Sequence, residues 1–331
     1  MAAPGRWRAA HRAQAGRPGQ LRGGVRSDRG TGLNGEAALR HWRPIAALVL
    51  ASFAWGFNWV VMKTAMQYAG PFEFCVHRAL VALVPLFAIL VLTGRARQPV
   101  PWGWIAWLSV FQTLLWGALT SGSVMTGSAG TSSILCYTMP FWVMLLAWPI
   151  LGERLRGWQW MAVALAAGGL LLVIAPWARS TTLLSSLFAT GAGLVWAIAA
   201  IITKRMRARV EVDLWSINAW NTLFGTALLL VAALLVPERQ TDWSTPYILA
   251  VLYNAFVPLT LCWFLWLYAL DRLVAPVAGL ATMMTPVTAI TLGWLLLGES
   301  PAGHELAGMA LIVCALAQLC WIGLRREAVR A

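Results

Sequence analysis

The sequence predicts an all-α integral membrane protein whose ten transmembrane helices form two inverted repeats of five helices each. Three observations support this prediction. Of the 331 residues, 60% are hydrophobic and 11% are charged, whereas a soluble domain carries about 25% charged residues. The apolar residues fall into stretches of about twenty, the length that crosses about 30 Å of hydrocarbon. Two short motifs also occur twice, at nearly constant spacing.

Short segments rich in glycine, proline or charge separate the apolar stretches. Helices are expected because a backbone in lipid must satisfy its own hydrogen bonds. The stretches also lack the alternation of apolar and polar residues that is typical of a membrane β-barrel. The ten spans are predicted at residues 44–63, 73–93, 103–120, 129–151, 158–176, 183–203, 214–236, 246–270, 274–297 and 304–324.

The first 43 residues hold nine arginines and two acids and show no apolar periodicity, which predicts a disordered, Arg-rich cytoplasmic tail. This tail carries seven of the thirteen net positive charges, so the charge does not indicate a nucleic-acid partner. Binding of RNA or anionic lipid by the tail is the alternative to a loose leader. The predicted domains are the tail (1–43), two repeats (44–176 and 183–324) and a C-terminal cytoplasmic tail (325–331).

The distribution of Lys and Arg predicts that both termini are cytoplasmic. With the N-terminal tail inside, 21 basic residues fall on the cytoplasmic side, and only Arg179 and Arg239 fall in outside loops. One miscounted span would reverse every loop beyond it, so this asymmetry favours ten spans. The expected location is the cell (inner) membrane, with the lipid bilayer as the surrounding medium.

The internal repeat rests on two pairs of matched positions. Proline and glutamate are thirteen residues apart in the fourth and ninth spans, and tryptophan and lysine are eight apart in the first and sixth. The odd number of spans per copy inverts the second copy, as in many secondary transporters. The matched residues are Pro140 and Glu153 with Pro286 and Glu299, and Trp55 and Lys63 with Trp196 and Lys204.

The segment Trp55-Gly56-Phe57-Asn58, followed by Lys63, Pro71-Phe72-Glu73-Phe74 and Arg78, resembles the opening of the EamA family of the drug/metabolite transporter superfamily. The two Leu-Gly-Glu helix ends resemble that family's repeated signature. The resemblance covers about residues 44–324 and implies a bundle of two inverted EamA repeats that moves small metabolites, often as an exporter. The second copy has Ala219 where a counterpart of Arg78 would fall, so an asymmetric cavity is expected.

The inverted repeat and the resemblance together predict a secondary transporter that exports small metabolites or amino-acid-like solutes by alternating access. A non-transporting membrane sensor or assembly factor is the alternative. The chain has no GxxxxGK[ST] motif for nucleotide, no GxSxG motif and no histidines at metal-ligand spacing. We therefore expect no enzyme activity, catalytic residue, metal or cofactor, and a small molecule as the partner.

Polar groups inside apolar spans are costly and are therefore candidates for function. Amides that bond between helices, and tryptophans that anchor the membrane interface, are the structural alternatives. The candidates for a substrate cavity are Trp55, Asn58, Arg78, Tyr137, Trp196, Asn218, Asn254 and Thr282.

Lys63 and Glu73 flank the first outer loop and are candidates for an outer gate. Lys63 and Arg78 would attract an anionic group of the substrate. Alternatively, the two basic side chains snorkel to the interface or pair with Glu73.

Pro140 and Pro286 are expected in the middle of their helices, where proline removes a hydrogen bond and bends the axis. Such kinks would shape the cavity and act as flex points; static curvature is the alternative. Glu153 and Glu299 are expected to anchor loops at helix ends rather than to carry protons.

Overall fold

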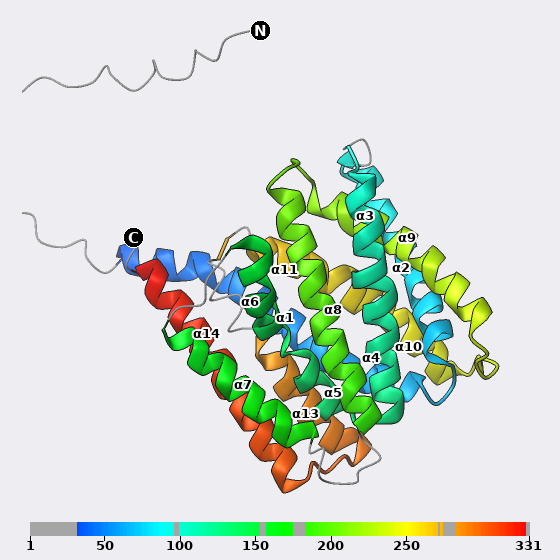
Figure 1. Cartoon of the computed structure of the whole chain (residues 1–331). Coiled ribbons are helices and arrows are strands. Elements are labelled where there is room, and N and C mark those ends of the chain that lie inside the picture. Colours follow the sequence, from blue (N-terminus) through cyan, green and yellow to red (C-terminus); the bar gives the residue numbers. More distant parts are fainter. Residues whose placement is uncertain are drawn as a thin grey trace, which may run out of the picture. The chain divides into compact units, whose positions relative to one another are not determined.

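The computed structural model describes residues 32–95, 99–152, 157–174, 183–270, 272–273 and 282–328, and every regular element in these ranges is a helix (Figure 1). The elements are α1 (Gly32–Ala65), α2 (Pro71–Leu92), α3 (Trp102–Leu108), the π-helix η2 (Ser109–Leu115), α4 (Trp116–Thr126), α5 (Ala129–Cys136), α6 (Met139–Leu151), α7 (Trp158–Ile174), α8 (Leu183–Arg207), α9 (Leu214–Leu235), α10 (Thr245–Phe256), the π-helix η3 (Val257–Leu261), α11 (Cys262–Leu270), α13 (Met284–Leu297) and α14 (Gly303–Ala328).

In the described residues, each of the ten predicted spans coincides with one helix or with consecutive helices; residues 274–281 of the ninth span lie outside them. Among the described residues, seven helical segments are long and apolar enough to cross a membrane, whereas α7 and α13 are apolar but shorter. The third span is built from α3, η2 and α4. The lateral surface carries large exposed apolar side chains, among them Val84, Leu92 and Leu234, as a protein surrounded by lipid requires.

The helical ends differ from the sequence-based boundaries at both termini. Helix α1 begins at Gly32, inside the segment for which the sequence predicts disorder, and α14 continues to Ala328, beyond the predicted end at 324. Residues 1–31 lie outside the described residues, as do Arg97, Glu153 and Arg179.

The two halves of the chain share local irregularities as well as helix order. A π-helix interrupts the third span at η2 and its repeat counterpart, the eighth span, at η3. Both Leu-Gly-Glu motifs end a helix through a left-handed glycine, with φ of 72° at Gly152 and 67° at Gly298, a conformation open to glycine because it lacks Cβ. Repeat-related helices also pack in pairs, α2 with α9 and α7 with α14.

The placement of the two prolines corrects a prediction. Pro140 and Pro286 do not lie mid-helix: each occupies the first turn of a helix, α6 and α13 respectively. The fourth span is broken before Pro140, at Tyr137 and Thr138, between α5 and α6. Proline is compatible with a first turn because the N–H it lacks has no partner there. The break in the span therefore precedes the proline instead of occurring as a kink at it.

Candidate functional site

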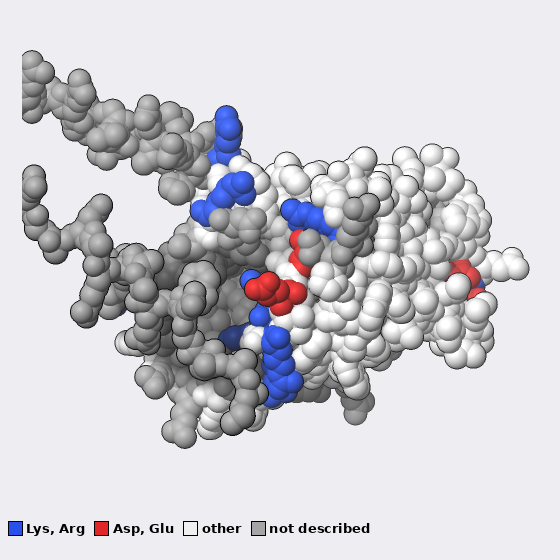
Figure 2. Space-filling model, turned by 90° about the horizontal axis from the view of Figure 1, so that it is seen from above, with Lys and Arg blue, Asp and Glu red and all other residues white. Residues whose placement is uncertain are grey.

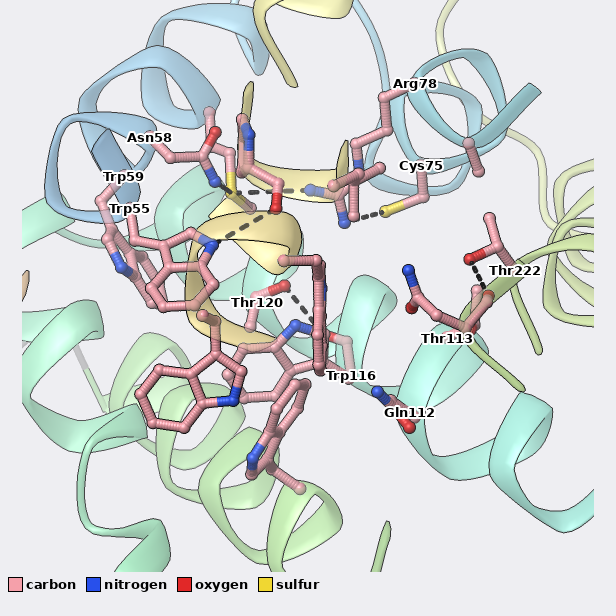
Figure 3. Close-up of a pocket in the computed structure, with 18 of the residues that line it drawn as sticks. Trp55, Asn58, Trp59, Cys75, Arg78, Gln112, Thr113, Trp116, Thr120 and Thr222 are labelled. Carbon is pink, nitrogen blue, oxygen red and sulfur yellow. Dashed lines mark hydrogen bonds between the residues drawn. The ribbon is translucent and has the colours of Figure 1, made fainter. Parts of the chain in front are cut away.

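A cavity of about 340 Å³ lies between the two halves of the chain (Figure 3). Its volume is at the lower end of the range, about 300 to 1,000 Å³, of small-molecule sites. Both repeats contribute to its wall: Trp55, Asn58, Trp59, Met62, Cys75, Arg78, Ala79, Gln112, Thr113, Trp116, Thr120, Tyr137 and Met139 from the first, and Trp196, Asn218, Asn221, Thr222, Leu229, Pro258, Leu259, Trp263, Trp266, Thr282 and Thr285 from the second.

The structure gathers seven of the eight cavity candidates onto this wall, although they come from six different spans. The eighth, Asn254, is fully buried behind the wall, where its Oδ1 accepts a hydrogen bond of 3.2 Å from Arg78 Nη1. Asn254 thus acts between helices, in agreement with the structural alternative for such amides. Two amide oxygens of the wall, Oδ1 of Asn58 and Oδ1 of Asn221, have no hydrogen-bond partner among the described residues.

Arg78 is the charged side chain of this wall and is 8% exposed. Besides Asn254, its guanidinium contacts two weak acceptors, Cys75 Sγ at 3.4 Å and Met62 Sδ at 3.8 Å. It also lies 5.2 Å from the centre of the Phe74 ring. Asn58 Nδ2 donates to the same Met62 sulfur at 3.2 Å, so the two polar candidates share one neighbour.

Six tryptophans give the cavity a largely aromatic lining. Trp116 and Trp196 lie 4.6 Å apart between ring centres, and Trp263 lies 6.4 Å beyond Trp196. On another side, Trp55 packs edge-on against Trp266 and donates from Nε1 to the Pro258 carbonyl in η3. The irregular turn of η3 therefore offers a carbonyl that a tryptophan of the other repeat can reach.

A second cavity of about 660 Å³ shares Gln112, Trp196 and Trp263 with the first. It continues along α8 to Lys204 and Arg207, whose side chains are exposed at the end of that helix. Lys and Arg side chains gather at this end of the bundle (Figure 2). We call it the basic end; the second cavity lies between it and the central cavity.

At the opposite end, contacts between the two repeats hold the helix termini together. Glu299, which follows α13, accepts hydrogen bonds from the backbone N–H groups of Ala129 (2.8 Å) and Gly130 (3.2 Å), the first residues of α5. Lys63 Nζ donates to the Gly127 carbonyl at 2.5 Å and is attracted by the Glu299 carboxylate. A carboxylate at a helix N-terminus is favoured by the free N–H groups and the helix dipole.

Glu238 makes an equivalent contact at the start of α2. Its two carboxylate oxygens accept from the N–H groups of Phe72 and Glu73, each at 3.0 Å. The Glu73 carboxylate accepts from Thr241 Oγ1, so Glu73 also joins the two repeats. We call this end, with Lys63, Glu73, Glu238 and Glu299, the clamped end. Glu153, the first-copy counterpart of Glu299, lies outside the described residues.

Sequence reasoning missed several residues of the wall. Trp116 and Trp263 occupy the third and eighth spans 147 residues apart, close to the repeat offset, and this spacing was the signal that could have identified them. Gln112 and Thr113 are polar residues in an apolar span and were detectable on the same ground as Asn58. Glu238 had no such signal, because its partners are backbone groups of a distant segment.

Relatives are found among bacterial transporters. The chain is 27% identical over 277 residues to "Uncharacterized transporter YoaV" of Bacillus subtilis. The aligned stretch covers 81% of this chain and 94% of that protein. It is 27% identical to the "Probable amino-acid metabolite efflux pump" of Salmonella typhimurium (81% and 91% covered) and 25% identical to the "Riboflavin transporter" of Rhizobium johnstonii (86% and 92%).

A crystal structure of a protein 20% identical in sequence shares the fold, with a TM-score of 0.58 over 85% of this chain and 99% of that chain. Two successive stretches, residues 42–175 and 183–320, each match the EamA-like transporter family. The two matches span most of the chain and agree with its duplicated, all-helical, multi-pass architecture. With a small-molecule cavity between its two halves, this chain belongs to the EamA-like transporter family.

Proposed function

We propose that this transporter exports small metabolites or amino-acid-like solutes across the inner membrane by alternating access. The observation that carries the proposal is the asymmetry of the central cavity. A second cavity that shares three lining residues with the central one reaches the basic end of the bundle, whereas inter-repeat contacts by Glu238 and Glu299 hold the clamped end together. This is the arrangement of an inward-facing carrier if the basic end faces the cytoplasm.

The orientation in this proposal comes from the positive-inside rule. Exposed Lys204, Arg205 and Arg207 lie at the basic end, which on this rule faces the cytoplasm together with both termini. Reporter fusions at Arg97 and Arg239 are expected to report opposite sides of the membrane. Reports from the same side would contradict both the orientation and the ten-span topology.

Transport is tested with purified protein in proteoliposomes loaded with a metabolite panel, after untargeted metabolomics of medium from overexpressing and deleted cells has selected the solutes. We expect at least one solute to exchange across the vesicle membrane, and the exchange to fall when Trp55, Asn58 or Arg78 is replaced.

A sensor or assembly factor would instead tolerate these substitutions. The efflux and transport functions named for two of the relatives support the transporter over this alternative. Vesicles that move no solute in either direction across the panel would refute the proposal.

A further inference from the structure

Arg78 carries a buried positive charge with little compensation. Of its hydrogen-bond acceptors only Asn254 Oδ1 is an oxygen; Cys75 and Met62 offer sulfur, a weak acceptor. The ion pair found in the part of the chain that the structure describes joins Arg95 and Asp213 and does not involve Arg78. A guanidinium has five N–H donors, so several remain for another partner.

A charge in such surroundings is costly unless an opposite charge or a set of strong acceptors meets it. The described wall of the cavity provides no opposite charge, because its other members are apolar, aromatic, amide or hydroxyl side chains, and Asn254 Oδ1 is the one oxygen that accepts from the guanidinium there. An anionic group of a bound solute would supply the opposite charge that the described wall lacks. The planar fork of arginine matches a carboxylate, with which it forms two parallel hydrogen bonds.

The surface next to this guanidinium is aromatic. A Cβ built on Gly117 would lie 3.5 Å from Arg78 Nη2, so the guanidinium rests against the backbone of α4 one residue from Trp116. From Trp116 the indole wall continues to Trp196 and Trp263. Figure 3 shows Arg78 and Trp116 on opposite sides of the same space. A solute whose carboxylate meets Arg78 would place its body on these rings.

Among the described residues of the site, Arg78 is the single charged side chain. In the second repeat Ala219, fully buried, stands where a counterpart of Arg78 would fall, and the nearby lining residues Asn218 and Asn221 are neutral. One guanidinium neutralises one negative charge, which favours monoanions over dianions.

We propose that Arg78 is the anion-binding residue of the cavity and that the cargo is a small monocarboxylate with a planar or aromatic body held by Trp116. This inference rests on the proposed transport function and names the chemical class of its substrate.

The test is calorimetric binding to the full chain in lipid nanodiscs, using four probes that separate charge from ring. They are 3-phenylpropionate, its neutral amide, the cation phenethylamine, and butyrate, which has the carboxylate without the ring. We expect 3-phenylpropionate to bind at least about tenfold more tightly than each of the others, the effect of losing one hydrogen bond to a charged group or one aromatic contact.

Variants locate the two contacts. Arg78→Gln should weaken 3-phenylpropionate at least about tenfold, and Arg78→Lys less, because it keeps the charge but loses the fork. Trp116→Ala should weaken 3-phenylpropionate and leave butyrate unchanged. Arg272→Gln is the matched control, since it removes an exposed arginine whose guanidinium stacks on Tyr268, away from the cavity wall, and should retain unaltered affinity.

Equal affinity for the carboxylate and its amide in the unmodified protein would overturn the proposal without any variant, even if Arg78→Gln fails to fold. Retention of full affinity in folded Arg78→Gln would overturn it too. Flux in proteoliposomes is a separate measurement. Carboxylate binding without flux of any solute would refute transport and leave the site intact, whereas flux of amines or neutral solutes without carboxylate binding would refute the site and leave transport intact.

Discussion

Replacing Glu299 should open the clamped end. This carboxylate joins the end of α13 in one repeat to the start of α5 in the other through two backbone N–H groups, at 2.8 and 3.2 Å. It also attracts Lys63, which itself holds the Gly127 carbonyl. Glu299→Ala removes both hydrogen bonds and the attraction to Lys63. Glu299→Gln removes the charge but keeps one amide oxygen that can accept from a single N–H group.

Hydrogen bonds to charged groups contribute about 1.5 to 3 kcal/mol each. Glu299 is partly exposed, so water replaces part of these hydrogen bonds when the clamped end opens. The net loss of free energy is therefore smaller than the sum of the two hydrogen bonds. We expect Glu299→Ala to destabilise the clamped conformation by about 2 kcal/mol and Glu299→Gln by about 1 kcal/mol. The ratio of unclamped to clamped molecules then rises about 30-fold and about 5-fold, respectively.

The population can be measured by the labelling rate of a cysteine at Thr131, which is 6% exposed in the first turn of α5. The five native cysteines are replaced, and a membrane-impermeant maleimide is added to whole cells or to inside-out vesicles. The rate should rise in the order parent, Glu299→Gln, Glu299→Ala, from the outside only.

Glu305→Gln is the matched control for Glu299. Its carboxylate accepts from Ala302 N at the start of its own helix, so its loss should leave the labelling rate unchanged. Equal labelling of the parent and Glu299→Ala, or an equal rise in Glu305→Gln, would refute the clamp.

Four further predictions follow from other contacts. Glu238→Ala and Gly70→Ala should each raise the rate of cysteine labelling at the clamped end, because a Cβ on Gly70 would clash with the Glu238 carboxylate. Both changes disturb the same contact, so the double variant should be labelled no faster than the single variants. Gly308→Val should lower the apparent Tm, because a Cβ there would lie 2.6 Å from the Gly169 carbonyl and would force α7 away from α14. The expected loss of stability is about 1–3 kcal/mol. Gly303→Val is the control, since a Cβ at Gly303 meets open space. Asp213→Ala should lower the stability by about 1 kcal/mol, because it removes the N-cap hydrogen bond from Ser216 N. Asp213→Asn keeps this cap and loses only the partly exposed ion pair with Arg95, so its Tm should stay close to that of the parent. Asn254→Ala should lower Tm because Arg78 loses its oxygen acceptor, and saturating 3-phenylpropionate should recover part of the loss; no recovery would argue against a carboxylate at Arg78.

The interior of the cavity shows where sequence-based reasoning stops. Asn58 and Arg78 could be recognised because a polar group in an apolar span stands out against its neighbours. Trp116 and Trp263 did not stand out among 21 tryptophans, since the same side chain serves at the lipid interface and in a cavity. The predicted mid-helix position of Pro140 was wrong because the turn at Tyr137 and Thr138 carries no comparable local signal.

The sequence by itself determined the ten helical spans, the duplication and the family, because hydrophobic length and repeated motifs are properties of consecutive residues. The tertiary structure alone decided that a second cavity adjoins the central one toward one end of the bundle, while the other end is clamped. That difference depends on Glu238 and Glu299 meeting backbone N–H groups some 165 to 170 residues away. Backbone donors are present at the start of every helix, so only the packing of the two repeats selects which of them a carboxylate reaches.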